Sequence, residues 1–463
     1  MRTAHFQSLC VILLLAASTF AQPNPVPIIF KPLVPGAVTP GSTGFTLTVN
    51  GANFVPGAVV KWNGHTRSTR FVSSTKVQAK ILASDVPTPG TASVTVLNPT
   101  PGHGTSNVGL FLVTNPTTSV SFTQNDMDGL VFDATGFASG DWDNDGNMDV
   151  TVVGDFGSGM LKSFLGNGDG TLQLVQTKMF GATEGGRMGV GDLNGEGIVD
   201  LAVPTDSGIA FFRGAGDGTF RSAASVISLP VKSIALADFN RDGILDLAAN
   251  QGEAGVGIAL GKGGFSFGPL VTYAPDSSPF DVVVGDFNRD GNLDFATCNG
   301  SANTVSVFLG NGDGTFESAN NYATGSFAIR MDTGDLNGDG VLDLVVADEE
   351  DDSVSVLLGN GDGSFQPYQS YSTINGPVPV ALADLNGDGI LDLVTGLVFD
   401  TSEGGIGVNL GNGDGTFGPA HKLPKVLANS FTIADLNGDG HLDVVSQADD
   451  VGEPLTVLLQ TSQ

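Results

Sequence analysis

One nine-residue pattern of oxygen-bearing side chains recurs seven times between residues 141 and 443. Each copy has an acid at positions 1, 5 and 9, Asn or Asp at position 3, and glycine at position 6. Alternate side chains at the start of a tight loop converge on one point, and the glycine permits the positive φ that bends the chain around an ion. Oxygen ligands without sulfur or imidazole favour Ca²⁺ over zinc or copper, and Mg²⁺ requires a tighter octahedron.

We number these copies as loops 1 to 7, at residues 141–149, 192–200, 238–246, 286–294, 335–343, 384–392 and 435–443. Their candidate calcium ligands are Asp141, Asp143, Asp145, Asp149, Asp192, Asn194, Glu196, Asp200, Asp238, Asn240, Asp242, Asp246, Asp286, Asn288, Asp290, Asp294, Asp335, Asn337, Asp339, Asp343, Asp384, Asn386, Asp388, Asp392, Asp435, Asn437, Asp439 and Asp443. Up to seven ions are expected. Loop 2 is expected to bind weakly because Glu196 has a longer side chain than aspartate. Loop 1 carries one extra charge at Asp143 and is expected to bind most tightly.

The alternative is a set of acidic turns without metal, since Asp, Asn and Gly all favour turns. Turn formation alone does not require an acid at three positions in all seven copies. The loops contain 22 of the 49 acids, and grouping carboxylates is costly unless a cation compensates the repulsion. The pattern therefore favours metal binding.

The spacing of the loops indicates one structural unit that is repeated. Successive copies begin 46 to 51 residues apart, and positions 2 and 8 of every copy are apolar. In the sixth repeat, four strands are expected: Val380–Ala383, Leu391–Thr395, Gly407–Leu410, and a fourth from Thr416 onward. Each loop would then hold an ion with its odd-numbered residues and contact the core with two others.

A second glycine-rich turn, Gly411–Gly415 in the sixth repeat, has two interpretations. It could be another acidic ion site or a hairpin turn. The third repeat has Gly261-Lys262-Gly263-Gly264 at this place, which favours the hairpin turn.

The two ends of the repeat array complement each other. After Asp443 the chain has room for strands at Val444–Ser446 and Thr456–Leu459 only, so the seventh unit lacks its fourth strand. An unassigned apolar run, Val120–Thr123, precedes loop 1. We expect it to supply the missing strand and to close a ring, because closure removes exposed sheet edges.

Residues 26–114 alternate apolar and polar side chains in short runs that turns interrupt. Phe45, Leu47 and Val49 alternate with threonines, and Pro56-Gly57 and Asn63-Gly64 mark turns. This pattern is typical of a β-sandwich. Trp62 could be a ligand platform, but a core position in a strand is the better interpretation.

Two family resemblances follow from these segments. Gly334-Asp335-Leu336-Asn337-Gly338-Asp339-Gly340-Val341-Leu342-Asp343 and Leu358-Gly359-Asn360-Gly361-Asp362-Gly363-Ser364-Phe365 resemble FG-GAP/VCBS repeats of the integrin-α type. Leu47–Phe54, Val60–Gly64 and Val94–Pro99 resemble IPT/TIG domains. The resemblance implies an all-β protein in which an immunoglobulin-like β-sandwich (26–114) precedes a seven-bladed β-propeller (119–463) with calcium on one face.

The chain as a whole has features of an exported protein. Residues 1–21 are expected to be a signal peptide, with Arg2, an apolar run and the small residues Thr19 and Ala21 before the cleavage point. The destination would be the periplasm, the cell surface or the extracellular space. Without the signal, only Cys298 remains, so no internal disulfide can form. The formal charge of −30 disfavours nucleic acid, and no membrane insertion is expected.

A variable position lies five residues before each loop. In a propeller it would lie on the face opposite the loops, where variation on a repeated scaffold suits a binding rim. Arg187, Asp281 and Arg330 occupy it, and Lys232 lies beside it. These four residues are a candidate rim for an anionic or polar ligand, and an ordinary solvated rim is the alternative.

No nucleophile motif, phosphate loop or zinc cluster occurs in the sequence, so an enzyme is not expected. Asp281 and Asp332 are the acids that an enzyme could use. Carbohydrate binding ranks second. Sugar-binding surfaces use exposed Trp and Tyr side chains, and this chain has just 2 Trp and 4 Tyr. We therefore expect, in this order, a monomeric calcium-binding scaffold or adhesion module for a protein partner, a lectin-like propeller for a surface glycan, and a polysaccharide-active enzyme or its accessory module.

Overall fold

The computed structural model describes residues 22–102, 104–127, 134–154, 159–181, 186–227, 230–373, 376–397, 405–423, 428, 430–447 and 454–461. The expected signal peptide lies outside these residues. In the described part, the regular structure is β-strand apart from four short 3₁₀ helices, which are η1 (Ala83–Asp85), η2 (Gly252–Ala254), η3 (Gly300–Ala302) and η4 (Glu349–Asp351). No helix of this part is long and apolar enough to cross a membrane.

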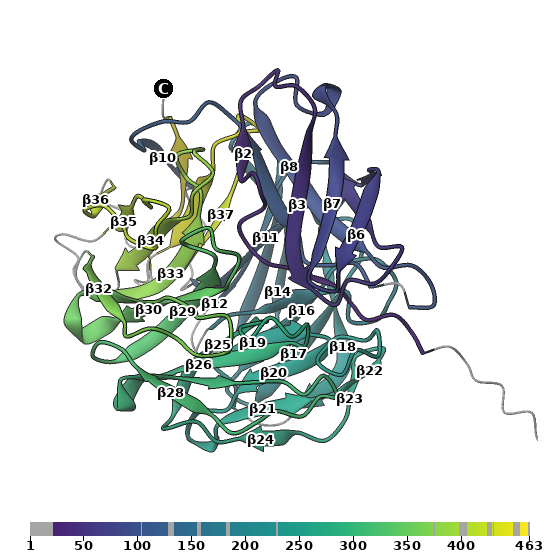
Figure 1. Ribbon diagram of the computed structural model, residues 1–463, viewed down its shortest axis with the longest axis vertical. Coiled ribbons are helices and arrows are strands. Elements are labelled where there is room, and N and C mark those ends of the chain that lie inside the picture. Colours follow the sequence, from purple (N-terminus) through teal and green to yellow (C-terminus); the bar gives the residue numbers. More distant parts are fainter. Residues whose placement is uncertain are drawn as a thin grey trace, which may run out of the picture.

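The N-terminal segment forms two sheets that pack face to face. One sheet has the strand order β1 (Ile28–Ile29), β3 (Phe45–Ala52), β7 (Lys76–Ile81) and β6 (Thr69–Ser73). The other has the order β2 (Ala37–Val38), β9 (Gly109–Val113), β8 (Gly90–Leu97), β4 (Val59–Trp62) and β5 (His65–Thr66). We call this unit the sandwich, and it stands at the top of Figure 1 in purple and blue.

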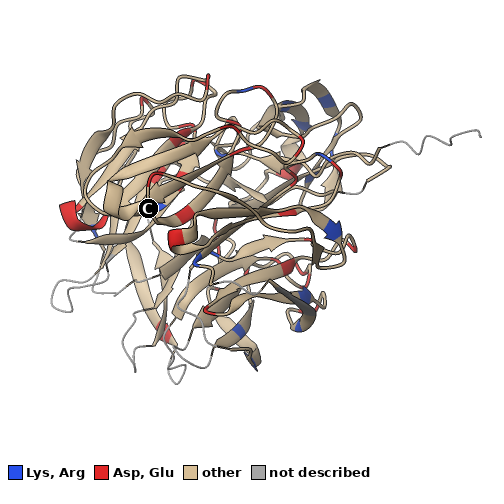
Figure 2. Ribbon diagram, turned by 90° about the horizontal axis from the view of Figure 1, so that it is seen from below, with Lys and Arg blue, Asp and Glu red and all other residues tan. Residues whose placement is uncertain are grey.

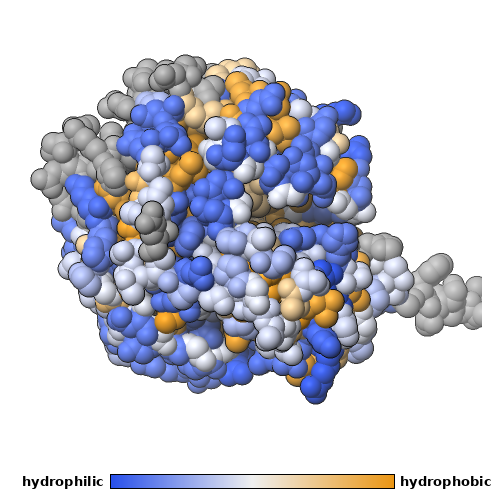
Figure 3. All heavy atoms as spheres, turned by 90° about the horizontal axis from the view of Figure 1, so that it is seen from above, coloured by the Kyte–Doolittle hydropathy of each residue, from blue (hydrophilic) through white to orange (hydrophobic). Residues whose placement is uncertain are grey.

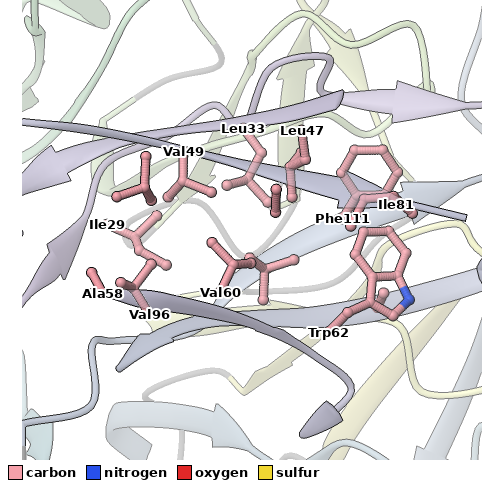
Figure 4. Packing of buried hydrophobic residues seen from close by; sticks show 14 of the residues in the cluster. Ile29, Leu33, Leu47, Val49, Ala58, Val60, Trp62, Ile81, Val96 and Phe111 are labelled. Atoms are coloured by element: carbon pink, nitrogen blue, oxygen red, sulfur yellow. The ribbon is translucent and has the colours of Figure 1, made fainter. Parts of the chain in front are cut away.

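The alternation of apolar residues in the sandwich strands produces its core. Leu47 and Val49 of β3 face inward while Thr46 and Thr48 face outward. Trp62 is 2% exposed and packs against Phe111 with 5.0 Å between ring centroids (Figure 4). The prediction that Trp62 is a core residue is therefore confirmed.

Seven further four-stranded antiparallel sheets are formed by the described residues that follow, and we number them by the loop that each contains. Sheets 1 to 3 are β11 (Ala134–Gly140), β12 (Asp149–Gly154), β13 (Met160–Gly166) and β14 (Leu172–Met179); β15 (Gly189–Gly191), β16 (Asp200–Thr205), β17 (Gly208–Gly214) and β18 (Phe220–Ile227); and β19 (Ser233–Ala237), β20 (Asp246–Asn250), β21 (Val256–Ala259) and β24 (Val271–Tyr273). The hairpin of β22 (Gly261–Gly263) and β23 (Ser266–Phe267) extends sheet 3.

Sheets 4 to 7 repeat this order. They are β25 (Pro279–Gly285), β26 (Asp294–Asn299), β27 (Thr304–Phe308) and β28 (Asn320–Ala323); β29 (Ala328–Gly334), β30 (Asp343–Asp348), β31 (Ser353–Leu357) and β32 (Gln369–Ser372); β33 (Pro377–Ala383), β34 (Asp392–Leu397), β35 (Ile406–Asn409) and β36 (His421–Lys422); and β37 (Ser430–Ala434), β38 (Asp443–Gln447), β39 (Leu455–Gln460) and β10 (Phe122–Met127).

The first strands of these sheets surround a common axis. β15 contacts β19, β19 contacts β25, and the contacts continue through β29 and β33 to β37, which contacts β11. A hydrogen bond from Gly186 N–H to the Thr135 carbonyl (3.3 Å) joins the second sheet to the first. The sheets therefore follow one another in a closed ring, the arrangement of a β-propeller, in the lower part of Figure 1.

The expected closure of the array is confirmed. β10 pairs antiparallel with β39 over six residues, from Phe122 opposite Gln460 to Met127 opposite Leu455. The strand therefore begins two residues later and extends further than the Val120–Thr123 run indicated. Sheet 7 combines a strand from the start of the array with three from its end, so the two ends of the ring are held together by backbone hydrogen bonds.

The fourth strand of the sixth repeat was predicted too early. It is β36, which begins at His421, and Thr416 lies in the turn before it. Phe417 explains the difference: it forms an isolated bridge with Gly411, and its buried ring packs against Tyr371 of sheet 5 (5.5 Å between centroids). The Gly411–Gly415 segment is a hairpin turn, as predicted, because Gly411 and Phe417 on its two sides form an antiparallel bridge. The Asp414 carboxylate accepts hydrogen bonds from Thr416 beside it.

Candidate metal centres

The seven acidic loops occupy equivalent places in the ring. Each connects the first strand of its sheet to the second, and position 9 is always the first residue of that second strand. The residue at position 2 is buried in every copy and anchors the loop in the core between sheets. The loops therefore lie together at one face of the ring, with position 5 of every copy at least partly exposed and positions 2 and 9 buried.

The backbone of the loops brings the odd-numbered side chains together. In loop 6, Asp384 accepts hydrogen bonds from the N–H groups of Asp388 (3.1 Å) and Gly389 (2.8 Å). The Asn386 side-chain oxygen also accepts from Asp388 N–H (3.1 Å). The position 1 bond to the glycine N–H and the position 3 bond to the position 5 N–H recur in all seven loops. One local conformation is thus repeated around the face.

The conformation requires a left-handed residue at two positions. Glycine at position 6 has φ between 80° and 94° in all seven loops, as its place in the pattern predicted. Position 4 is also left-handed in every loop, with φ of 60° at Arg241 and 59° at Arg289. The sequence analysis missed this second requirement because position 4 varies among Gly, Asn and Arg, and Asn and Gly are the residues that tolerate it best.

Position 9 has a structural function in addition to its place among the predicted ligands. Asp392 accepts N–H bonds from Leu385 at position 2 (2.8 Å) and from Gly411 at the end of the third strand (2.9 Å). All seven position 9 residues are fully buried and accept the two equivalent bonds. Each therefore connects its loop to the end of the third strand of its sheet, which in sheet 7 is β39.

Burial makes these carboxyl groups weak acids in the absence of a cation. Burial, and then the neighbouring acids of the loop, raise the pKa of Asp149, Asp294 and Asp392 to about 7, although N–H bonds act in the opposite direction. The pKa of Asp200 in loop 2 is raised to about 6. A divalent cation would bind the ionised form and remove this unfavourable ionisation.

The residues present fit a hard cation. The candidate donors are carboxylate and amide oxygens, and an oxygen that accepts one N–H bond still has a free lone pair for a metal. In loop 1, ligand atoms of Asp141, Asp143 and Asp149 all lie within 4.8 Å of one another. That convergence agrees with the extra charge that the sequence assigns to loop 1.

Loop 2 differs from the other loops because its position 5 residue, Glu196, forms an ion pair with an arginine. Arg213 of β17 donates from Nε to Glu196 Oε1 (2.7 Å), and its Nη2 pairs with the other carboxylate oxygen. Both interactions lower the pKa of Glu196. A guanidinium group from the third strand therefore neutralises the carboxylate that position 5 would give to an ion. The sequence analysis noticed the length of Glu196 but not this partner, which lies 17 residues away.

We expect the calcium count to rise when this pair is removed. Glu196→Asp combined with Arg213→Ala should increase the bound calcium by about one ion per chain, because it restores a short carboxylate and removes the competing cation. Metal analysis after equilibrium dialysis measures the count. Arg221→Ala is the matched control, since Arg221 lies directly opposite Arg213 on β18. An unchanged count in the double variant would contradict the expectation.

The stability of the metal-free protein should fall as the pH rises, and calcium should oppose this loss. Unfolded aspartates ionise near their ordinary pKa of about 3.9, whereas the buried position 9 groups hold their protons until about pH 7. Without calcium, rising pH in this window favours the unfolded chain, so metal-free protein should lose stability from about pH 4 to pH 7. Calcium binds the ionised form. The gap in melting temperature between calcium-loaded and metal-stripped protein should therefore widen from pH 5 to pH 8, and thermal melts in metal-free buffers measure it. A gap that narrows would contradict this.

The candidate ligand rim requires correction. Asp281 has no exposed surface, and its carboxylate accepts hydrogen bonds from Ser233 Oγ (2.6 Å), Met331 N–H (3.2 Å) and Arg187 Nη2 (3.2 Å). Arg187 also donates to the Met331 carbonyl (2.6 Å). Residues of sheets 2, 3, 4 and 5 therefore satisfy one another's hydrogen-bonding groups. Asp281 is not available to a ligand.

Lys232 and Arg330 reach the surface, as does part of the Arg187 side chain, which is 36% exposed. Lys232 is exposed, with its Nζ 5.2 Å from the centroid of the Phe280 ring. Arg330 is half-buried, close enough to Cys298 for its charge to oppose the effect of burial, which raises the pKa of that thiol. The structure thus brings Arg187 and Asp281 together as an ion pair and leaves Lys232 and Arg330 outside that pair.

Asp332, the second acid considered for catalysis, is also engaged. Its Oδ2 accepts hydrogen bonds from Leu382 N–H (2.9 Å) and from Lys31 Nζ (2.5 Å). Lys31 belongs to the sandwich and also donates to the Leu382 carbonyl (3.0 Å). The charges of Lys31 and Arg187 hold the pKa of Asp332 below its ordinary value in spite of its burial. Asp281 and Asp332 therefore join neighbouring inner strands, and no pair of free acids remains between them.

The class defined by this ring and its acidic loops is the β-propeller with loop-borne acid clusters. A family model described as FG-GAP-like repeat matches residues 141–203, 192–249, 238–297, 287–346 and 335–395, which together cover more than half of the chain. The chain therefore belongs to the FG-GAP-like repeat family, as the repeated loops predicted.

Solved structures resemble the chain at low sequence identity. A crystal structure of BBS1N in complex with ARL6DN, soaked with lead, is 10% identical with a TM-score of 0.51 over 74% of this chain and 98% of that one. The periplasmic gluconolactonase PpgL of Pseudomonas aeruginosa is 14% identical with a TM-score of 0.47, over 77% and 95%. An auxiliary nutrient binding protein from Bacteroides ovatus is 12% identical with a TM-score of 0.37, over 94% and 98%. No curated protein matches the sequence.

Proposed function

We infer that the protein is an exported, calcium-stabilised scaffold with one seven-bladed propeller and an IPT/TIG-type immunoglobulin-like domain. The observation that carries this proposal is the hydrogen-bond pattern that all seven loops share, in which every candidate metal ligand is an oxygen atom. Positions 1, 3, 5 and 9 and the position 7 carbonyl would hold each ion. Calcium supplies the positive charge that these clusters lack. It would take the structural role that disulfides have in other exported proteins.

We propose binding of a protein partner as the activity, acting as a monomer in the periplasm, at the cell surface or outside the cell. Neither tryptophan offers an exposed platform for sugar, since Trp62 is 2% and Trp142 is 6% exposed. The face in Figure 3 is largely hydrophilic, with hydrophobic side chains in small separate areas. A polar surface of this kind suits a reversible contact with another protein better than an obligate apolar interface.

A lectin-like propeller is the second candidate, and a polysaccharide-active enzyme or accessory module is the third. Tyr368, at 37% exposed, is the aromatic side chain that a sugar could reach most easily among the described residues. Lys232, Arg330 and the exposed part of Arg187 are the rim residues that remain for an anionic glycan. The engagement of Asp281 and Asp332 in structural hydrogen bonds disfavours catalysis by that pair.

The proposal is tested in two steps on the mature chain. Metal analysis after dialysis against calcium and magnesium together should find several calcium ions per chain. A pull-down from the native cell envelope, followed by titration of the purified candidate in calcium and in chelator, should give saturable, calcium-dependent binding. Binding to a glycan array instead would favour the lectin, and calcium-dependent turnover of a polysaccharide would favour the enzyme. A chain that retains no calcium would overturn the proposal.

A further inference from the structure

The sandwich rests on the face of the ring that carries the acidic loops. At loop 3, Val26 N–H donates to Asp238 Oδ2 (2.7 Å) and Asn53 Nδ2 donates to the Asp238 carbonyl (3.0 Å). Asn53 and Asp238 are both buried. The position 1 residue of this loop, a candidate calcium ligand, is therefore also a docking residue for the sandwich.

Four other loops contact the same domain through atoms of their own backbone. At loop 5, Asp335 N–H donates to the Lys31 carbonyl (3.0 Å), and at loop 6, Thr117 N–H of the connecting segment donates to the Asn386 carbonyl (2.8 Å). Loops 4 and 7 approach so closely that a Cβ at Gly291 would lie 2.8 Å from Ser74 Oγ, and one at Gly440 would lie 2.5 Å from the Val113 carbonyl. The sandwich therefore contacts the backbone of loops 3 to 7, and these contacts depend on the conformation of the loops.

Side chains add two contacts to this interface. Thr114 Oγ1 lies 3.0 Å from Nε2 of His441, the position 7 residue of loop 7. Lys31 passes beyond the loops to Asp332 in the first strand of sheet 5. The described residues show no hydrogen bond between the sandwich and loops 1 or 2.

We propose that calcium in loops 3 to 7 holds the sandwich on the ring, so that ion binding and domain docking are one linked equilibrium. This rests on the calcium binding proposed above. The docking atoms are N–H and carbonyl groups within or beside the ligand positions, and they fit the sandwich only when the loops keep the conformation shown. An ion fixes that conformation, whereas its removal leaves carboxylates that repel one another. Docking in turn should raise calcium affinity by the same factor.

The net charges of the two parts, taken alone, predict the opposite effect: removal of calcium would strengthen docking of the sandwich. This long-range attraction is expected to be a small contribution. Residues 22–118 carry Lys31, Lys61, Arg67, Arg70, Lys76 and Lys80 against Asp85, whereas residues 119–463 carry 12 cations and 48 acids. Figure 2 shows acids distributed around the ring. A metal-free face would thus attract the sandwich more strongly. However, none of these cations forms an ion pair with a loop acid in the described residues, and Lys31 pairs with Asp332 instead. Attraction between charges more than about 8 Å apart is screened at physiological salt. The direct contacts between the loops and the sandwich therefore determine whether calcium removal weakens docking.

Hydrogen exchange of the full chain tests the proposal. Val26 and Thr117 donate their amides across the interface, so peptides covering residues 23–38 and 112–118 report docking. Stripping the metal should accelerate their exchange at least about tenfold. A peptide from β31, which is buried in sheet 5 and contains no loop residue, should keep its protection and thereby show that the ring is still folded.

Two matched variants locate the effect. Asp384→Asn with Asp388→Asn removes charges from loop 6, which contacts the sandwich, and should accelerate exchange of residues 112–118 even with calcium present. Asp141→Asn with Asp145→Asn makes the same change in loop 1 and should leave that peptide unchanged. Equal effects of the two variants would overturn the proposal. So would unchanged exchange after metal analysis had shown full release of calcium, an outcome that leaves calcium binding itself intact. A chain that never binds calcium would overturn both.

Discussion

Removing calcium is expected to lower the melting temperature of the protein by on the order of 10 °C or more. Extracellular calcium modules commonly bind with dissociation constants of about 0.1–1 mM. At ten times that concentration, each site adds roughly 1.4 kcal/mol to the free energy of unfolding, so six or seven sites add on the order of 10 kcal/mol. This is comparable with the whole stability of a typical domain. The loss should be large because each ion connects two strands of a sheet through a buried position 9 residue.

Differential scanning calorimetry of one preparation measures the effect, first with millimolar calcium and then after metal removal. Added magnesium is the control, because its octahedral preference should restore little of the lost stability. Readdition of calcium should restore the original melting temperature. Equal melting temperatures with and without calcium would show that the loops are acidic turns rather than metal centres.

Opening the ring at sheet 7 should have an effect of similar size. Replacing Phe122–Met127 by a flexible Gly-Ser segment of equal length removes β10 and leaves β39 as an unpaired edge. The buried Phe122 side chain alone should account for about 3–5 kcal/mol. Loss of the six-residue pairing adds to this, and the exposed edge should promote self-association. We therefore expect a destabilisation of more than about 4 kcal/mol and a concentration-dependent increase in molecular mass.

Urea unfolding and light scattering after size-exclusion chromatography measure these two quantities. The matched control replaces β28, Asn320–Ala323, which is the outermost strand of sheet 4 and has mostly exposed side chains. It also removes a fourth strand, but it leaves the ends of the array joined. If both replacements cost the same free energy, closure would have no special importance for this ring.

The repeated loops could be found from sequence because their requirements are local. Positions 1, 3, 5 and 6 act within a few residues of one another, so their chemistry recurs at a fixed spacing, as in loop 6 from Asp384 to Gly389. The strand that closes the ring was also recognisable, since the last repeat lacked one strand and an apolar run before loop 1 was left over. These features determined the family, the all-β class and the candidate ligands.

Tertiary structure decided which of the candidates are engaged elsewhere. Arg213 reaches Glu196, Arg187 reaches Asp281 across 94 residues, and Lys31 reaches Asp332 across 301 residues. These pairs combine residue types that also occur as solvated surface charges, and nothing in their spacing distinguishes the two roles. The position of the sandwich over loops 3 to 7 belongs to the same category, because it depends on backbone atoms that every sequence has and on side-chain contacts between segments far apart in the chain, such as Asn53 with Asp238. Local patterns therefore identified the candidate sites, whereas the meeting of distant segments decided which of them are covered, neutralised or open.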